Sequence, residues 1–264
     1  MTDRELYKYA IEFLTSFREV TDEMLNKHLK SEYSKPKDLS IVYHRLCESA
    51  QNKQMSSKVI GGLINGLENL RKVLFDFDPV KVSQNFKKSD KDKLLDEIIE
   101  TLNPKGQIRR TNRSIWPLYC QSIIDGAHFI CSFKDAEDFY RWTDFFAEDF
   151  RAKPALPLMI SYEISGFGFP LACDFLKELG FAEYGKPDVH LKDIFKALNL
   201  IDQKEKSTTK LDYQTLKVID RIAKENDTTA YSVDKAFWLI GSGNFYLSDL
   251  KIGSQKKKFI EKIQ

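Results

Sequence analysis

Two glycines and a later aspartate are the residues whose types and spacing suggest chemistry most clearly. Gly166 and Gly168 flank Phe167 between two short apolar stretches, and Phe169-Pro170 begins the second stretch. Glycine permits a tight reversal with positive φ, and proline suits the first turn of a helix. Such a turn exposes backbone N–H groups beside a helix N-terminus, where an anion such as a DNA phosphate can bind. A plain helical hairpin without a ligand fits the same residues.

Asp188 follows Pro170 by 18 residues, in the run Pro187-Asp188-Val189-His190, where the apolar pattern of another helix begins. A carboxylate can stabilise positive charge that develops in a reaction, and it can activate a water molecule. The same side chain can instead cap the helix, a contribution of about 1 kcal/mol. The sequence leaves both roles open, and the two roles are compatible.

Residues 164–172, which read Ile-Ser-Gly-Phe-Gly-Phe-Pro-Leu-Ala, resemble the hairpin of the helix–hairpin–helix DNA glycosylase superfamily, the endonuclease-III-like group. That family reads Leu-Pro-Gly-Val-Gly-x-Lys-Thr-Ala, followed by Val-Asp-Thr-His. Gly166 and Gly168 match the hairpin glycines, and Asp188 matches the catalytic aspartate at about the family's spacing. The close match covers about 30 residues of the chain.

The resemblance implies an all-α fold of two helical lobes with a cleft between them. One lobe would be continuous and contain the hairpin, and the other would be assembled from both chain ends. Gly166, Phe167 and Gly168 would contact the DNA backbone, and Asp188 would drive excision of a base that has left the stack. Lys186 could pair with Asp188 or touch a phosphate, or it could be an exposed, solvated lysine.

Two departures from the family pattern matter for the chemistry. Pro170 stands where the lyase members carry a lysine, and proline has no amine with which to form a Schiff base with the sugar. Ser165 replaces the usual proline. By this analogy the chain resembles a monofunctional glycosylase or an inactive relative.

A basic loop, residues 104–114, contains no acidic residue. Local positive charge of this kind supplies much of the non-specific affinity for a nucleic-acid backbone. In the family, the loop ahead of the following helix inserts a side chain into the gap that the flipped base leaves. A solvated basic loop is the alternative. The candidate DNA-binding residues are Lys105, Gln107, Arg109, Arg110, Asn112 and Arg113, with Gln107 or Asn112 as the inserted side chain.

Four aromatic residues could form a stacking wall for a flipped base. At helical spacing they could equally belong to the hydrophobic core. They are Trp116, Tyr119, Trp142 and Trp238. The run 231–246 also contains Asp234, which the sequence alone does not place relative to Asp188.

Composition excludes several classes of protein. The 264 residues are 42% hydrophobic and 30% charged, too apolar for a disordered chain, and the formal net charge is +2. No apolar run approaches the ~18 residues of a membrane span, and the N-terminus does not read as a secretory signal. The cysteines form no C-x-x-C, so the ligands of a zinc ribbon or an iron–sulfur cluster are absent. We therefore expect no metal, no cofactor and a cytoplasmic protein, with a bacterial nucleoid or a nucleus equally compatible.

Apolar residues recur at helical spacing along most of the chain, and no run alternates as a strand would. The segment 75–86 is predicted as a loop with a short turn, and the glycines within 57–75 predict a break or a close helix contact. About a dozen helices are expected. They cover 3–18, 21–29, 39–50, 57–75, 89–102, 114–132, 135–150, 156–163, 169–179, 188–198, 211–225, 232–240 and a terminal helix within the run 251–263 that carries Lys256, Lys257 and Lys258.

The resemblance, applied to these elements, implies three regions. Residues 1–88 form an N-terminal helical region, residues 89–182 a helical lobe with the hairpin, and residues 183–264 a C-terminal region that packs with the N-terminal one. The chain is predicted to bind double-stranded DNA and to act as a monofunctional DNA glycosylase. A catalytically inactive hairpin module that binds DNA and a helical protein-interaction domain are the alternatives. The recognised base is not indicated, because pocket residues come from scattered parts of the chain.

Overall fold

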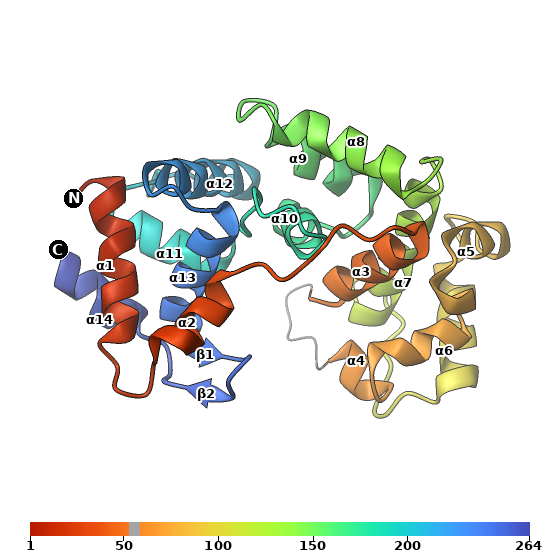
Figure 1. The fold of residues 1–264 in the computed structure, drawn as a ribbon. Coiled ribbons are helices and arrows are strands. Elements are labelled where there is room, and N and C mark those ends of the chain that lie inside the picture. The colour runs from red at the N-terminus through yellow and green to blue at the C-terminus, as the bar shows by residue number, and fades with distance from the viewer. Residues whose placement is uncertain (53–58) are drawn as a thin grey trace. The chain divides into compact units, whose positions relative to one another are not determined.

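The computed structural model describes residues 1–52 and 59–264. The chain forms two compact units (Figure 1). Unit 1 consists of Met1–Tyr33 and Gly180–Gln264, and unit 2 consists of Ser34–Leu179. Unit 1 is thus assembled from both chain ends, and unit 2 is continuous. The predicted boundaries of the three helical regions at residues 88 and 182 stay predictions, and so does the predicted cleft.

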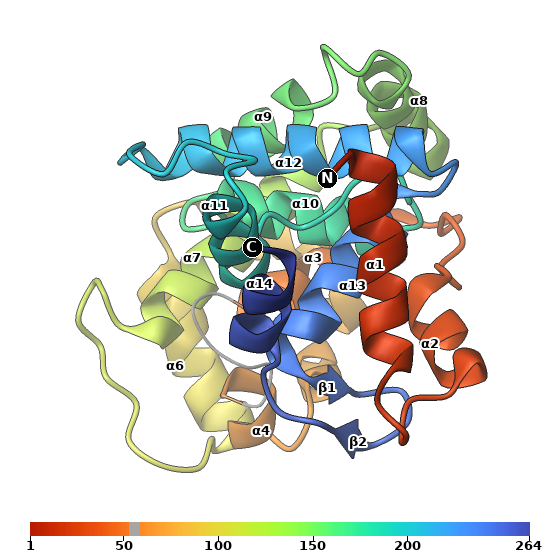
Figure 2. The same ribbon diagram turned by 90° about the vertical axis from the view of Figure 1, so that its left-hand side faces the viewer.

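Unit 1 is organised around one buried helix, α13 (Ala230–Ser242), which packs against five other helices of the unit (Figure 2). The side chain of Thr229 caps the start of α13, and a left-handed Gly243 follows its end. A short antiparallel hairpin pairs Asn244 with Lys251. The other elements are α1 (Asp3–Thr15), α2 (Asp22–Leu29), α11 (Val189–Ala197), α12 (Thr208–Glu225), β1 (Asn244–Phe245), β2 (Leu250–Lys251) and α14 (Lys256–Ile263).

The core of unit 1 joins the two ends of the chain through aromatic rings. The rings of Phe13 from α1 and Phe237 from α13 both pack edge-on against Phe259 of α14, with centroids 5.1 and 6.1 Å apart. Phe195 of α11 packs against Phe237 in the same way, at 5.1 Å. Edge-to-face pairs at these separations are favourable beyond the area they bury. These contacts fix α11, whose N-terminus carries Asp188, against α13.

Unit 2 has the apolar helix α7 (Ile115–Ile130) at its centre, packed against α3, α5, α6 and α9. Most of its residues are buried, in accord with its predominantly apolar sequence. The other elements are α3 (Leu39–Gln51), α4 (Ile60–Leu63), η1 (Leu67–Lys72), η2 (Phe75–Phe77), α5 (Pro79–Asn85), α6 (Lys91–Leu102), α8 (Ala136–Ala147), α9 (Ala155–Glu163) and α10 (Phe169–Glu178).

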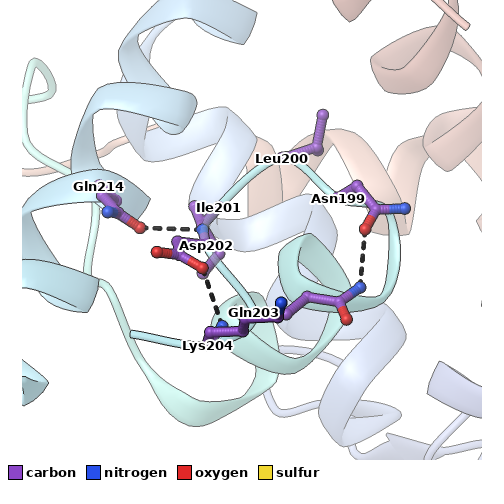
Figure 3. Close-up of a pocket in the computed structure, with 7 residues that line it drawn as sticks. All are labelled: Asn199, Leu200, Ile201, Asp202, Gln203, Lys204 and Gln214. Carbon is purple, nitrogen blue, oxygen red and sulfur yellow. Dashed lines mark hydrogen bonds between the residues drawn. The ribbon is translucent and has the colours of Figure 1, made fainter. Parts of the chain in front are cut away.

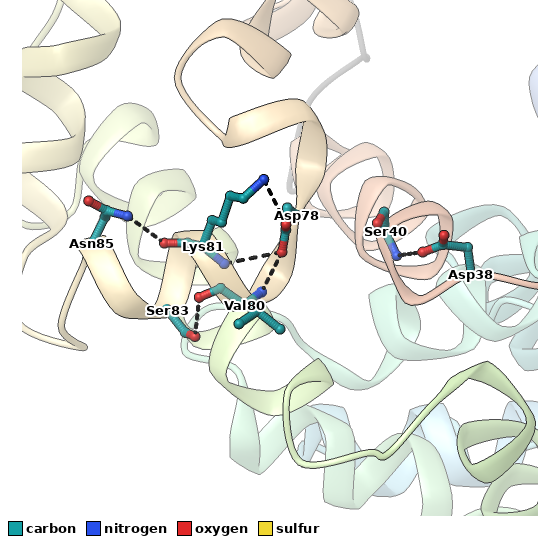
Figure 4. A network of polar contacts seen from close by, with 7 residues as sticks. All are labelled: Asp38, Ser40, Asp78, Val80, Lys81, Ser83 and Asn85. Carbon is teal, nitrogen blue, oxygen red and sulfur yellow. Dashed lines mark hydrogen bonds and ion pairs between the residues drawn. The ribbon is translucent and has the colours of Figure 1, made fainter.

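The prediction of a loop over residues 75–86 is wrong, because this segment contains the 3₁₀ turn η2 and the helix α5. The Asp78 carboxylate caps α5 by accepting bonds from the N–H groups of Val80 at 3.0 Å and Lys81 at 3.1 Å (Figure 4). Pro79 occupies the first turn, where its missing N–H is not needed. Asp78-Pro79 therefore begins a helix, although only a short apolar pattern follows it.

The remaining helix predictions are confirmed within a few residues where the structure describes the chain. Residues 57 and 58 of the predicted helix 57–75 lie outside the described residues. From residue 60 onward that helix is broken, as expected, into α4 and η1. The pairing of β1 with β2 was not predicted, since two-residue strands leave no alternating pattern. The fold is all-α apart from this pairing. None of the described helices is both long and apolar enough to cross a membrane.

Candidate functional site

The predicted hairpin is present between α9 and α10. Gly166 has φ +76°, a conformation that L side chains rarely adopt, and the Phe167 N–H closes the turn by donating to the Ile164 carbonyl at 3.0 Å. Gly168 caps α10, and its carbonyl accepts from two N–H groups of the first turn. In the described part of the chain, the N–H groups of Gly166, Gly168 and Phe169 have no hydrogen-bond acceptor. The loop thus presents three unbonded donors beside a helix N-terminus.

Phe167 and Pro170 limit which atoms of the hairpin can reach a ligand. The Phe167 side chain is 1% exposed, and its ring packs edge-on against Phe175, 6.2 Å away. Its ring fixes the loop to α10, so a contact of this residue with DNA would involve its backbone. Pro170 lies in the first turn of α10 and contributes no N–H and no amine.

Asp188 caps α11, as one of its two predicted roles requires. Its Oδ1 accepts from the N–H groups of His190 at 2.8 Å and Leu191 at 3.1 Å. Its Oδ2 has no hydrogen bond to any described residue. Burial is the largest influence on the pKa of Asp188 and raises it, and the Asp234 carboxylate raises it further. The hydrogen bond from the Leu191 N–H and the charges of His190 and Lys186 lower it, but the net pKa lies above the ordinary value. The cap therefore orients one oxygen and leaves the other available to a ligand.

The segment before Asp188 lies directly on α12 and α13. The Lys186 N–H donates to Oδ2 of Asp234, which is 2% exposed, at 2.9 Å. A Cβ added to Gly185 would lie 2.9 Å from Ile219 Cγ2 and 3.1 Å from the Ala230 carbonyl oxygen. The backbone approaches this closely only because residue 185 has no side chain. Lys186 is half-buried, so it is not the fully exposed, solvated lysine that one of the alternatives describes.

The basic loop 104–114 is exposed at the six candidate positions. Its start is fixed by the Lys105 N–H, which donates to the Leu63 carbonyl at 2.8 Å. Arg110 forms an ion pair with Asp96 at 2.6 Å, and Asn112 accepts a bond from Lys91 at 3.0 Å. Within the described ranges Lys105, Arg109 and Arg113 have no acidic partner, and Gln107 has no hydrogen bond. These four side chains remain available to a ligand, and a DNA contact stays a prediction.

The four candidate stacking residues are spread over different surroundings. Trp116 and Tyr119 are 4% and 3% exposed, and the Tyr119 hydroxyl donates to the Cys47 carbonyl at 3.2 Å, as expected for core side chains. Trp238 of unit 1 is half-buried against Tyr246. Trp142 of unit 2 lines a cavity of about 290 Å³. Their predicted part in a stacking wall stays a prediction, with burial favouring the core for Trp116 and Tyr119.

Each unit contains a hollow that is lined by described residues. The Trp142 cavity is also lined by Lys88, His128, Phe129, Ser132, Phe133, Met159 and Glu163. The other hollow, of about 670 Å³, is an open one around the turn at residues 199–204 (Figure 3). Its polar groups bond one another, with Gln214 accepting from the Asp202 N–H at 3.0 Å and Gln203 donating to Asn199 at 2.7 Å. This second hollow therefore has few groups left to bind a ligand.

The described residues contain no cluster that could hold a metal ion among their His, Cys, Asp and Glu side chains. All four cysteines lie within these residues, and none of them is in a disulfide there.

No protein-family model matches the chain, and no curated protein matches it significantly. Its structure is similar to the crystal structure of the Methanocaldococcus jannaschii 8-oxoguanine glycosylase/lyase in complex with a 15mer DNA that contains 8-oxoguanine. The TM-score is 0.55 over 88% of this chain and 94% of that chain, at 16% sequence identity. Likeness at this identity concerns the fold. The chain thus shares the all-α fold of that glycosylase/lyase, and an all-α fold is what its sequence predicts.

Proposed function

We propose that this protein binds double-stranded DNA and hydrolyses the N-glycosidic bond of a damaged or mismatched base that has left the helix. The observation that carries the proposal is the succession of two features within this fold. They are a hairpin with three N–H groups that bond to no described residue and, 18 residues after Pro170, an aspartate with one carboxylate oxygen that likewise has no hydrogen bond within residues 1–52 and 59–264.

In the proposed reaction the bond between the base nitrogen and C1′ of the deoxyribose breaks, and its electron pair leaves with the base. Positive charge develops on the sugar, and the ionised Asp188 carboxylate stabilises it. Water adds to C1′ and gives its proton to this carboxylate, and the base takes a proton from solvent. A pKa raised by burial and by Asp234 suits a group that both ionises and accepts a proton.

Binding to DNA is assigned to the hairpin and to the basic loop. The N–H groups of Gly166, Gly168 and Phe169 would donate to a phosphate, helped by the N-terminal end of the α10 dipole. Lys105, Arg109 and Arg113, which lack acidic partners in the described chain, would neutralise further phosphates. Gln107 and Asn112 are the candidates for insertion into the gap left by the flipped base.

The proposed reaction stops at base release. A lyase step needs an amine that forms a Schiff base with the sugar, and residue 170 is a proline. The structural neighbour is a glycosylase/lyase, so the two proteins would share the fold and differ in this step.

The test is a panel of duplexes with 8-oxoguanine, uracil, alkylated purines or mismatches, assayed for abasic sites. We expect at least one lesion to be converted by the wild type and not by Asp188→Asn, which keeps a helix-capping side chain. Asp193→Asn, an exposed acid on the same helix, is the matched control. DNA binding without base release would support the inactive module, and absence of binding at low salt would support a protein-interaction domain.

A further inference from the structure

Ser165, the residue before the first hairpin glycine, is bound on both of its peptide groups by side chains of α7. Its N–H donates to Oδ2 of Asp125 at 3.0 Å, and its carbonyl accepts from the hydroxyl of Ser122 at 2.7 Å. Ser122 and Asp125 lie one helical turn apart, so both side chains point from the same face of α7. The backbone that enters the turn is therefore fixed at two points by the central helix of unit 2.

The two side chains of α7 are themselves buried and supported. Ser122 is 2% exposed and Asp125 4% exposed. Oδ1 of Asp125 accepts from Nε2 of Gln121 at 2.9 Å, and the same nitrogen donates to the Lys88 carbonyl at 2.7 Å. Each Asp125 oxygen thus has a donor, as a buried carboxylate requires. The Ser165 N–H is one of these two donors, and its loss would leave a buried charge partly unsatisfied.

The negative charge of Asp125 by itself disfavours the proposed binding of a DNA phosphate. A carboxylate behind a loop that binds phosphate weakens that binding by like-charge repulsion, all the more at low local dielectric. Its contact with Ser165 instead restricts the loop before a ligand arrives, which lowers the entropy cost of binding. If repulsion dominates, removal of the Asp125 side chain raises DNA affinity. If positioning of the loop dominates, its removal lowers DNA affinity.

The identity of residue 165 fits the same contact. The glycosylase motif has proline at this position, and proline has no N–H to donate to Asp125. The backbone of Ile164, with φ −116° and ψ 107°, is compatible with a following proline, so the preceding residue does not exclude proline here. What a proline at 165 would remove is the bond to Asp125.

We infer that Ser122 and Asp125 are positioning residues that fix the hairpin through Ser165 in the conformation that receives a DNA phosphate. This inference rests on the proposed function for its ligand, and the contact itself can be measured without DNA. Ser165 and Asp125 act as a pair, so a change at one alters the effect of a change at the other.

The first experiment compares Asp125→Leu with Asp125→Asn in the full chain, using an undamaged duplex and fluorescence anisotropy. Asparagine keeps an acceptor for the Ser165 N–H, and we expect its affinity to equal or exceed that of the wild type. Leucine removes both the acceptor and the charge, and we expect affinity to fall about tenfold, in line with the worth of a hydrogen bond to a charged group. Affinity of Asp125→Leu equal to or above that of wild type would overturn the inference. Urea unfolding of each variant verifies that it is folded under the assay conditions.

The second experiment keeps the inference testable should Asp125→Leu not fold, and it needs no DNA. Amide hydrogen exchange at residues 165–168 is measured for Ser165→Pro, Ser122→Ala and Asp125→Asn. We expect faster exchange at Phe167, whose N–H closes the turn by donating to the Ile164 carbonyl, in the first two variants and wild-type exchange in the third. Unchanged exchange in Ser165→Pro and Ser122→Ala would overturn the inference. A wild type that binds no DNA, combined with the expected exchange pattern, would instead reject the proposed function and keep the contact.

A double-mutant cycle supplies the matched control. Ser165→Pro alone leaves the buried Asp125 carboxylate without one donor, and Asp125→Leu removes that carboxylate. We expect the loss of DNA affinity in the double variant to be smaller than the sum of the single losses. Additive losses would show that the two residues act independently, contrary to the inference.

Discussion

Oδ2 of Asp234 accepts a hydrogen bond from the backbone N–H of Lys186 at 2.9 Å, two residues before Asp188. Asp234 belongs to α13, the helix around which unit 1 is built. The same carboxylate is one of the two influences that raise the pKa of Asp188. One buried side chain of the central helix thus positions the segment that carries the proposed catalytic group and adjusts its protonation.

This relationship predicts a pH effect for Asp234→Asn. Asparagine can still accept from the Lys186 N–H, but its neutral side chain no longer disfavours ionisation of Asp188. The pKa of Asp188 then falls, and the acid limb of the rate profile for base release moves to lower pH. The profile is measured under single-turnover conditions, with Asp193→Asn as the control that leaves the limb in place. A limb that stays where it is in Asp234→Asn would contradict the role of Asp234.

Replacing Asp188 by asparagine is expected to stabilise the protein at pH 7. A carboxyl group whose pKa is higher in the folded state than in the unfolded state favours folding only while it is protonated, and this contribution is lost as pH rises. At pH 7 the ionised group opposes folding, whereas asparagine is neutral and still caps α11. Urea unfolding should give a higher free energy of unfolding for the variant at pH 7 and a smaller gain near pH 3. An Asp188→Asn protein less stable than the wild type at pH 7 would argue against this balance.

Two glycines are expected to respond to alanine in different ways. Gly185→Ala places a methyl group against Ile219 and the Ala230 carbonyl, which should lower stability by about 1–3 kcal/mol. At Gly168, φ is −68° and the nearest atom to an added Cβ is Pro170 Cδ at 3.8 Å, so alanine fits the fold. Gly168→Ala should keep its unfolding midpoint and lose DNA affinity, because the methyl group stands at the proposed phosphate site. Equal stability losses in Gly185→Ala and Gly168→Ala would contradict the closer packing around Gly185.

The basic loop offers a comparison between paired and unpaired arginines. Arg109→Ala and Arg113→Ala should each weaken binding to any duplex and reduce the salt slope of log K by about 1. Arg110→Ala should have a smaller effect, since Arg110 already forms an ion pair with Asp96. Affinities between about 50 and 200 mM salt measure both quantities. Salt slopes unchanged in Arg109→Ala and Arg113→Ala would remove this loop from the DNA-binding surface.

The local features of the fold and of the site were predictable from the sequence. The Asp188 cap depends on N–H groups two and three residues later, and the hairpin depends on glycines within one turn. Both are short-range patterns with a direct sequence signal. The helix α5 was missed although Asp78-Pro79 is a recognisable start, because few apolar residues follow it.

The contacts that position the site were not predictable in the same way. Ser165 and Asp125 are 40 residues apart, and Lys186 and Asp234 are 48 residues apart. Their pairing depends on how helices pack, which the periodicity of a single helix does not determine. An aspartate within the predominantly apolar sequence of α7 was the one local signal for Asp125, because a buried carboxylate needs donors.

The most direct test of the account is the single-turnover rate at which a lesion-containing duplex releases its free base, measured for the wild type, Asp188→Asn and Asp193→Asn. We expect release by the wild type and by Asp193→Asn, a loss of at least about 100-fold in Asp188→Asn, and no covalent adduct on borohydride treatment. Release by Asp188→Asn at the wild-type rate would contradict the assignment of Asp188 as the group that drives base excision.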